Sequence, residues 1–432
     1  MTKQHLIAAI DIGSAKIATL IVSQSPDDAL RLNAIGVSSV PSRGIKKSQV
    51  VDIEEAIAAI TDSVEAAERM AGFSVSNAVI SVSGEHIKSF NSKGVVAIGN
   101  PEGEVVEEDI SRVIEAAKAI SLPSSQEIIH VLPRTFTVDS QAGVRDPLGM
   151  SGVRLEAEAH IVTGSTAVIR NLRRCVDDIG VKVDNLVFAG LASGEATLSE
   201  TEKELGVVLV DIGGGTTSVA IFIDSALSYS SVTPVGAKNF TNDLAIGLRI
   251  SLESAEKIKR HLTQVANTLH PQLPLDSDVR VDRRSSDEID LTALNIKEEI
   301  RTASKKTLID GIIRPRLNEI FDFVGDEIKK SGFGGMTPAG IVITGGGAET
   351  VEVLSSCKRT LQLPARIGHP AGLFGLTDEI SSPAYATLTG LVLHAQRLPQ
   401  KSSRGGLSIL SGQLPGKDLV TKATAFIKSL LP

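Results

Sequence analysis

Two acidic residues, each followed by a glycine turn, are the chain's first candidates for chemistry. Asp211 ends an apolar run and precedes a turn rich in glycine. The residues of this turn are Gly213, Gly214, Gly215, Thr216 and Thr217. Backbone N–H groups in such a turn can converge on an anion, because a missing Cβ lets phosphate oxygens approach closely. The carboxylate would repel the phosphate without a cation between them. The stretch therefore predicts a phosphate site with Mg²⁺ held by Asp211 through water, since Mg²⁺ dehydrates reluctantly.

The same design stands near the start of the chain. Asp11 follows an apolar run, and Gly13, Ser14 and Lys16 come directly after it. Asp11 and Asp211 stand 200 residues apart, which indicates two similar halves that each carry one acid-and-glycine turn. Two such turns facing each other would grip a polyphosphate from both sides, with Mg²⁺ beside both acids. Lys16 would add a positive point charge.

Both turns are predicted to join one strand to another. Residues 207–210 form a continuous apolar run typical of a strand buried on both faces, and residues 216–223 are again rich in β-formers. A dinucleotide fingerprint instead opens a helix, and the P-loop string G-x-x-x-x-G-K-[ST] is absent from the sequence. A hairpin whose glycines serve only its twist is the plain alternative for the second turn taken alone.

A third glycine turn and a short helix complete the candidate site. Residues 340–344 are predicted to form a buried strand, followed by Gly345, Gly346 and Gly347 and then by a helix start with Glu349 in its first turn. A flat base or ribose can lie against such bare backbone. Residues 251–260 are predicted to form an amphipathic helix with Glu256 and Lys259 at i, i+3 on one face. A surface ion pair is the plainer interpretation of these last two residues.

The composition limits the other classes of function. The chain has 432 residues, of which 42% are hydrophobic, enough for two or more cores. A net charge of -7 and the absence of Trp give no support to nucleic-acid binding. Cys175 and Cys357 show neither a metal spacing nor a disulfide framework, and we interpret the histidines as structural. The sequence shows no signal peptide and no apolar stretch of the about 18 residues that a membrane span needs.

The end of the sequence differs from the rest. Residues 400–416 are rich in Ser and Gly and are predicted to be a flexible linker. Residues 417–432 are predicted to form a basic amphipathic helix that lies on an anionic membrane surface. The residues expected at the membrane are Leu419, Val420, Lys422, Ala423, Phe426, Ile427, Lys428, Leu430 and Leu431. Docking on the chain's own core or in a partner's groove is the alternative.

Three turns in the order DIGS, DIGGGTT and TGGG resemble the nucleotide-binding motifs of the actin, sugar-kinase and heat-shock ATPase superfamily. Three further strings, VPSRGIKKSQVVDIEEA, DPLGMSGVRLEAEAHIVTG and VDNLVFAGLASGEATL, resemble the FtsA family of actin-like bacterial cell-division proteins. The resemblance covers residues 7 to about 398, and the tail fits it too. It implies ATP and Mg²⁺ as cofactors, and filaments on the cytoplasmic side of the cell membrane at the division site. It also implies that the chain tethers FtsZ, the tubulin-like ring protein, and recruits later division proteins.

The resemblance implies an α/β fold of two ribonuclease-H-like halves that close over ATP. Actin's usual second subdomain is missing, and a different subdomain is inserted in the first half. The expected boundaries are 1–83 and 164–203 for the first half, 84–163 for the insert, 204–228 and 308–399 for the second half, 229–307 for an FtsZ-binding subdomain, 400–416 for the linker and 417–432 for a membrane-targeting helix.

Carried over residue by residue, the resemblance places the two acid-and-glycine turns on the phosphates and the Mg²⁺. It places Glu256 and Lys259 at the ribose–adenine edge, residues 345–347 at the adenosine, and Gly236 in TPVGAKNF at the phosphate end. Residues 296–320 are predicted to be helical with a basic middle, which would bind the acidic tail of FtsZ. The basic residues are Arg301, Lys305 and Lys306. A solvated helix face is the alternative for this stretch.

One position departs from relatives that hydrolyse ATP. They orient the attacking water with an acid or amide just before a turn into a helix, and apolar Phe188 occupies that place here. A Phe side chain can neither accept a proton nor orient water. We therefore name no catalytic residue and expect tight ATP binding with at most weak ATPase activity. Asn185 or Glu195 would substitute only in a different helix register.

Other members of the superfamily fit the sequence less well. A sugar kinase would leave the basic tail unexplained, a chaperone ATPase needs a peptide-binding domain for which too few residues remain, and MreB-like proteins keep the usual second subdomain. A cytoplasmic scaffold of a pilus or secretion system, with the same insert, is the most serious alternative. Such a scaffold would lack the basic terminal helix.

Overall fold

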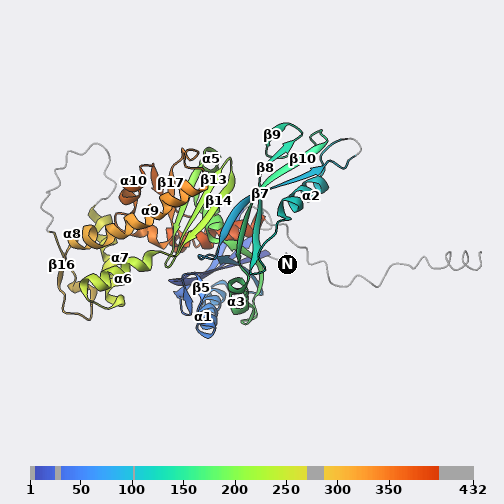
Figure 1. Cartoon of the computed structure of the whole chain (residues 1–432). Helices are drawn as coiled ribbons and strands as arrows, with labels where there is room; N and C mark the ends of the chain where they lie inside the picture. The colour runs from blue at the N-terminus through green and yellow to red at the C-terminus, as the bar shows by residue number, and fades with distance from the viewer. Residues whose placement is uncertain (1–4, 25–30, 101–102, 270–286, 398–432) are drawn as a thin grey trace, which may run out of the picture. The chain divides into compact units, whose positions relative to one another are not determined.

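The computed structural model describes residues 5–24, 31–100, 103–269 and 287–397 (Figure 1). The elements below lie in one compact unit, Met1–Gln396, except that the last helix ends one residue beyond it at Arg397. The linker predicted at 400–416 and the membrane helix predicted at 417–432 lie outside the described residues.

The first sheet combines an antiparallel meander with parallel strands. Strands β1, β2 and β3 form the meander, while β6 lies parallel to β1 and β11 lies parallel to β6. The strand order is β11-β6-β1-β2-β3-β19. The bounds are β1 His5–Ile12, β2 Lys16–Gln24, β3 Leu32–Pro41, β6 Asn77–Val82, β11 Lys182–Phe188 and β19 Phe374–Gly375, with the small pair β4 Ile45–Lys46 and β5 Gln49–Val50 nearby in sequence.

The second sheet repeats this plan. Strands β12, β13 and β14 form an antiparallel meander, β17 lies parallel to β12, and β18 lies parallel to β17. The order β14-β13-β12-β17-β18 therefore matches β3-β2-β1-β6-β11 strand for strand. The bounds are β12 Val207–Ile212, β13 Thr217–Ile223, β14 Ala226–Thr233, β17 Ile341–Thr344 and β18 Ala365–Ile367. The internal repeat predicted from the two aspartates is present in the topology.

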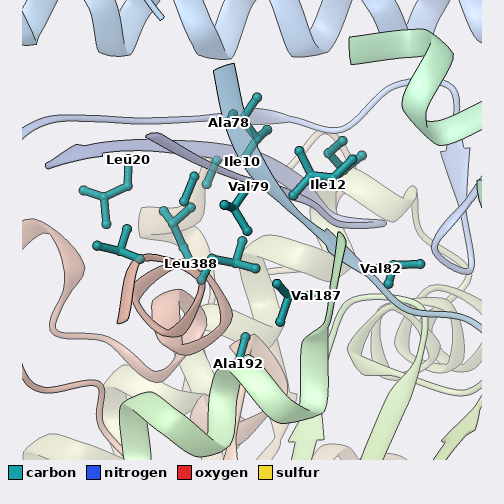
Figure 2. Packing of buried hydrophobic residues seen from close by; sticks show 14 of the residues in the cluster. Ile10, Ile12, Leu20, Ala78, Val79, Val82, Val187, Ala192 and Leu388 are labelled. Atoms are coloured by element: carbon teal, nitrogen blue, oxygen red, sulfur yellow. The ribbon is translucent and has the colours of Figure 1, made fainter. Parts of the chain in front are cut away.

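Helices cover both sheets and place the apolar core between the layers. Ala192 of α4 (Ala189–Thr197) and Leu388 of α12 (Ala386–Arg397) belong to the same buried apolar cluster as Ile10 and Val79 of the first sheet (Figure 2). Helix α1 (Ile53–Ala71) packs on β2 and β3 and is capped at both ends, by the Asp52 side chain and by Gly72 in the left-handed conformation. The remaining helices beside the sheets are α3 Thr166–Asp177, α5 Glu200–Leu205, α9 Arg314–Ser331, α10 Val353–Leu361 and α11 Thr377–Ile380.

Residues 84–163 fold around a separate small core. Four strands in the order β7-β10-β8-β9 form its sheet, and α2 (Glu107–Lys118) packs on β7 and β10. A Cβ at Gly94 would collide with the Val113 carbonyl, so helix and strand touch through bare backbone. Helix α2 stands between strands β7 and β8 in sequence. The strands are β7 Lys88–Ala97, β8 Gln126–Val138, β9 Gln141–Val144 and β10 Arg154–Ser165.

The segment between the two parts of the second half contains α6 (Ala237–Leu248), α7 (Leu252–Leu269), β15 (Glu288–Asp290), β16 (Thr302–Ser304) and α8 (Lys305–Leu308). The prediction of a continuous helix over residues 296–320 is wrong for its first part. Thr302 and its neighbours pair with β15 instead, and the Ser304 hydroxyl caps the helix that begins at Lys305. A π-helical turn at Ile309–Ile313 then leads into α9. Within the described residues, no helix has the length and apolar character needed to cross a bilayer.

Candidate functional site

Both acid-and-glycine turns join strand to strand, as predicted. In the first turn the Gly13 N–H donates to the Lys16 carbonyl at 3.1 Å, and in the second the Gly213 N–H donates to the Thr216 carbonyl at 2.9 Å. The flanking pairs are equivalent too, with Ile12 opposite Ile17 and Ile212 opposite Thr217. The two turns are therefore the same local structure, built once in each half.

The tips of the two hairpins touch. A Cβ on Gly214 would lie 2.6 Å from the Ala15 Cβ, and one on Gly215 would lie 2.7 Å from the Ser14 Oγ. Ser48 links both sides, because its N–H donates to Ser14 Oγ at 2.7 Å and its hydroxyl lies 3.2 Å from Thr216 Oγ1. Glycine is required at these positions by the close approach of the opposite hairpin. The structure thus brings together the first and second turns that the sequence predicts to face each other.

Asp211 is buried and Asp11 is partly buried, and the two lie close enough for the charge of Asp11 to act on Asp211. Ser81 Oγ donates to Asp11 Oδ1 at 2.7 Å, while Asp211 Oδ2 accepts from Ser193 at 2.5 Å and from Thr387 at 3.1 Å. Burial raises the pKa of Asp11 despite the Ser81 hydrogen bond and the Lys16 charge. Burial, and also the charge of Asp11, raise the pKa of Asp211 to about 6. A cation between the two carboxylates would stabilise the ionised form of each and so lower both pKa values.

The donor set suits a cation that keeps most of its water. The described residues contain no group of three or more His, Cys, Asp or Glu side chains placed to hold a metal ion. Mg²⁺ is commonly bound through one or two carboxylates, several waters and substrate phosphates. Asp11 and Asp211 fit that mode.

Lys16 lies against an aromatic ring. Its Nζ is 3.2 Å from the centroid of the Tyr385 ring, a cation–π contact. Burial lowers the pKa of Lys16 to about 8, opposed by the charges of Asp11 and Glu349. Tyr385 belongs to the short turn Pro383–Tyr385 that precedes α12. Neither Tyr385 nor the hydroxyl partners of the aspartates is predicted from the sequence.

The third glycine turn packs on the second hairpin. Gly345 has a φ of 82°, and a Cβ there would collide with Asp211 Oδ1, so only glycine fits. Gly347 lies against Ile212 in the same way, while Gly346 is exposed. A 3-10 turn at Gly346–Glu349 follows, and α10 begins only at Val353. The predicted helix start is therefore displaced beyond Glu349 by this turn.

Gly236 holds the back of the second hairpin. The N–H groups of Ala237 and Lys238 at the start of α6 donate to the carbonyls of Gly213 and Gly214, both at 2.8 Å. A Cβ at Gly236 would lie 2.6 Å from the Gly213 carbonyl oxygen. The helix start is thus bonded to the hairpin, and it fixes the hairpin's shape.

Glu256 and Lys259 form more than a surface ion pair. Lys259 Nζ lies 2.6 Å from Glu256 Oε2 and 2.9 Å from Thr241 Oγ1, and Thr241 donates to the same carboxylate oxygen at 2.6 Å. The Lys259 side chain is only 14% exposed. Burial opposes ionisation of Glu256, but Lys259 and Thr241 outweigh it and lower the pKa. This triad joins α6 to α7.

Phe188 is fully buried at the junction between β11 and α4. Its backbone N–H donates to His130 Nε2 at 3.0 Å. Glu195 Oε1 lies 2.7 Å from His394 Nδ1, and Asn185 is exposed on β11. Glu195 is therefore paired with a histidine of α12, and Asn185 lies at the surface.

The predicted FtsZ-binding residues stand just before a strand and in the short helix that follows it. Arg301 is exposed before β16, while Lys305 and Lys306 stand in the first turn of α8. An open hollow of about 450 Å³ lies between α6, the π-helical turn and α9. Ile246 and the Arg316–Asp243 ion pair line it. None of the three basic residues lines this hollow.

Two family models match the chain. One described as "Cell division protein FtsA" matches residues 208–390, and one described as "SHS2 domain inserted in FTSA" matches residues 84–163. The chain is also similar to proteins named "Cell division protein FtsA". The relative from Pseudomonas aeruginosa is 36% identical over 414 residues, 96% of this chain and 94% of its own. The relative from Neisseria meningitidis is 38% identical over 394 residues, 91% and 90% of the two chains.

Solved structures are similar in fold at lower sequence identity. A chain of a PilM–PilN type IV pilus biogenesis complex has a TM-score of 0.61 at 17% identity, over 91% of this chain and 99% of that one. MreB 5 of Spiroplasma citri bound to AMPPNP has a TM-score of 0.50 at 13% identity, over 91% and 96%. These structures confirm the predicted actin-like fold, and the SHS2 match confirms the inserted subdomain.

Proposed function

The chain belongs to the FtsA family of cell division proteins, and from this premise we propose that it binds ATP with Mg²⁺ and forms actin-like filaments on the cytoplasmic side of the cell membrane. There it tethers FtsZ filaments and recruits later division proteins. The observation that carries the nucleotide proposal is the contact between the hairpin tips at Gly214 and Ala15, with Asp11 and Asp211 near each other.

The phosphates would be held by the hairpins. The Gly13 and Gly213 N–H groups bond within their own turns, so the other turn N–H groups and the ammonium of Lys16 would supply positive potential from both halves. The carboxylates of Asp11 and Asp211 orient the waters around Mg²⁺, which neutralises the phosphate charge when it is bound. One fold neighbour, MreB 5, holds AMPPNP, which supports a nucleotide as the ligand.

The adenosine would lie between α7 and the third glycine turn. Lys259 is held on Glu256 and Thr241, so these side chains are already ordered for polar contacts with a ribose and a base edge. Residues 345–347 offer bare backbone to the other face. Gly236 then acts at the phosphate end through the hairpin that it supports.

ATP turnover on this chain would be slow. Phe188 stands where a water-orienting side chain is expected, and its ring is fully buried. Bound ATP then serves to hold the two halves closed, and the closed shape favours polymerisation.

The parts of the chain divide this work. We assign residues 1–83 and 164–203 to the first half, 204–228 and 308–399 to the second, 84–163 to the insert and 229–307 to the subdomain that binds the acidic tail of FtsZ. Arg301, Lys305 and Lys306 supply its positive charge. Residues 400–416 are the linker and 417–432 the membrane helix. This assignment differs from that of a pilus or secretion scaffold. Only the similarity in fold supports that alternative.

Membrane binding and polymerisation would be coupled. Residues 401–432 carry five Lys or Arg and one Asp, and each basic residue near an anionic leaflet contributes about 1 kcal/mol. A single weak anchor binds reversibly, whereas a filament with many anchors gains roughly 10²–10⁴ in avidity. Weak monomer binding and strong filament binding follow.

The deciding experiment compares the full chain with a chain that ends at Gly412. Both are sedimented with anionic liposomes in the presence of Mg·ATP, and the pellets are examined by electron microscopy. We expect filaments on lipid for the full chain only, and no pelleting without ATP. Equal pelleting of the two chains, or none, would refute the membrane proposal. Calorimetric titration with Mg·ATP, with Asp211→Ala as the control, tests nucleotide binding separately.

A further inference from the structure

Two histidines of the inserted subdomain face the rest of the molecule side by side. His130 on β8 pairs with Val162 on β10, and His160 on β10 pairs with Leu132 on β8. Directly opposed residues on neighbouring strands share a face, so both imidazoles lie on the same face of the sheet at diagonal positions. Each contacts a different half of the chain.

His130 contacts the first half at a sensitive place. Its Nε2 accepts the backbone N–H of Phe188 at 3.0 Å, so its ring is neutral and carries its proton on Nδ1. Phe188 is the last residue of β11, and α4 follows it directly. Ser193 of α4, five residues after Phe188, donates to Asp211 across the two halves. The imidazole therefore fixes the start of the helix that supports the second aspartate.

His160 contacts the second half. Its Nε2 lies 3.0 Å from Ser230 Oγ, and its Nδ1 lies 2.7 Å from Asn91 Oδ1. Ser89 strengthens this link, because its hydroxyl donates to the Ser230 carbonyl at 2.7 Å and accepts the Ser230 N–H at 3.1 Å. His160 is 1% exposed, so these polar groups satisfy one another away from water.

The contacted strand is the edge of the second sheet. Ser230 lies on β14, whose Thr233 pairs with Thr217 at the end of the second glycine turn. Arg134 of β8 adds a further contact to β14 by donating to Ser228 Oγ at 2.9 Å, and it is itself held by Glu158 at 2.9 Å. The insert thus covers an otherwise unpaired edge with side-chain hydrogen bonds.

We propose that His130 and His160 are positioning residues of the nucleotide cleft, which join one insert to the β11–α4 junction of the first half and to strand β14 of the second. Through them the inserted subdomain sets how closely the two hairpins approach. This proposal rests on the nucleotide binding proposed above. It adds that the inserted subdomain is the element that regulates how closely the two hairpins approach.

The contacts of His130 and His160 with the two halves are made by neutral imidazoles. Burial lowers the pKa of His130, helped by the charges of His394 and His160, and burial with the Arg134 charge lowers the pKa of His160 to about 3. The charged or titratable groups around them are Arg134, Glu158, Glu195 and His394. The coupling is therefore expected to be constant between pH 6 and 8, unlike that of a histidine switch.

The test uses paired substitutions in the full chain. His130→Leu and His160→Leu remove the ring nitrogens, whereas His130→Gln and His160→Gln keep a neutral side chain that can accept a hydrogen bond. His5→Leu, at the exposed start of β1, is the matched control. Calorimetry gives the affinity for Mg·ATP, and amide hydrogen exchange without nucleotide reports on residues 186–191 and 226–233.

Each Leu variant is expected to bind Mg·ATP about fivefold to tenfold more weakly, the size of one lost buried hydrogen bond. The Gln variants are expected to stay within about twofold, and exchange in the free protein should accelerate for 186–191 in His130→Leu and for 226–233 in His160→Leu. If His160→Leu does not fold, Ser89→Ala tests the same link to β14 with a smaller change, and its 226–233 segment should exchange faster.

The outcomes separate the two proposals. Folded Leu variants with unchanged affinity and unchanged exchange would overturn the positioning role while leaving nucleotide binding intact. A wild-type chain that binds no Mg·ATP would overturn the proposed function, and with it the role in a nucleotide cleft. Faster exchange without any loss of affinity would reduce the histidines to structural contacts and would equally refute the proposal.

Discussion

Thr387 Oγ1 donates a hydrogen bond to Asp211 Oδ2 at 3.1 Å across 176 residues of sequence. The same carboxylate oxygen accepts from Ser193, and the two hydroxyls lie 2.9 Å apart. Helix α12 and helix α4 are therefore both hydrogen-bonded to the aspartate at the next-to-last position of β12. A substitution at Asp211 therefore alters the contacts of both helices.

Asp211→Asn is expected to stabilise the nucleotide-free, metal-free protein at pH 7. Asp211 has a pKa of about 6 in the folded protein against an ordinary 3.8, so the folded state binds the extra proton and loses stability as pH rises through that window. Removing the charge should recover on the order of 3 kcal/mol at pH 7 and almost nothing at pH 3. Thermal unfolding in a chelator between pH 3 and 8 measures this. A wild-type stability that rises between pH 4 and 6 more steeply than that of the variant would contradict it.

Gly214→Ala is expected to force the hairpins apart. Its Cβ would lie 2.6 Å from the Ala15 Cβ, and overpacking of this kind costs roughly 1–3 kcal/mol. Affinity for Mg·ATP should fall at least tenfold, because both hairpins hold the phosphates. Gly335→Ala is the matched control, since nothing lies within 4 Å of its Cβ and its φ is not in the left-handed region. Equal affinities of the two variants for Mg·ATP would contradict the proposal that both hairpins hold the phosphates.

Tyr385→Phe and Tyr385→Leu are expected to differ. The ring face, which phenylalanine keeps, holds the Lys16 ammonium at 3.2 Å, and a cation–π contact contributes about 0.5–2 kcal/mol. Tyr385→Phe should bind Mg·ATP like the wild type, and Tyr385→Leu about threefold to tenfold more weakly. Calorimetry of the three proteins decides, and a loss in the Phe variant as large as in the Leu variant would show that the hydroxyl matters instead.

Charge reversal at Arg301 and Lys305 is expected to weaken binding of an FtsZ tail peptide at least tenfold, since the ligand is acidic. The effect should shrink at high salt because these positions are partly or fully exposed. Lys329→Glu, a reversal on α9 at a side chain 82% exposed, is the control. Fluorescence anisotropy with a labelled peptide provides the measurement. Unchanged affinity in the double variant would remove these residues from the binding site.

The hairpins and the repeat were predictable from the sequence because their signals are local. An apolar run, an acid and glycines within ten residues determine a strand–turn–strand unit, and its recurrence at Asp211 predicts the second half. The helix predicted across 296–304 failed because pairing with β15, a tertiary contact, outweighed the local pattern. The side chains that hold the aspartates and Phe188 in place could not be predicted either. Ser193, Thr387 and His130 are ordinary residues whose roles appear only once distant segments meet.

The strand-for-strand repeat of the two sheets has a consequence for assembly. Two equal halves would give the molecule a pseudo-twofold axis, and its opposite ends would be interchangeable. The insert at residues 84–163 occurs in one half only, so it breaks that symmetry and gives the molecule a polarity. A protofilament built by repeating one contact between such copies is heterologous and has distinct ends. Its growth and its loading with partners can then be directional.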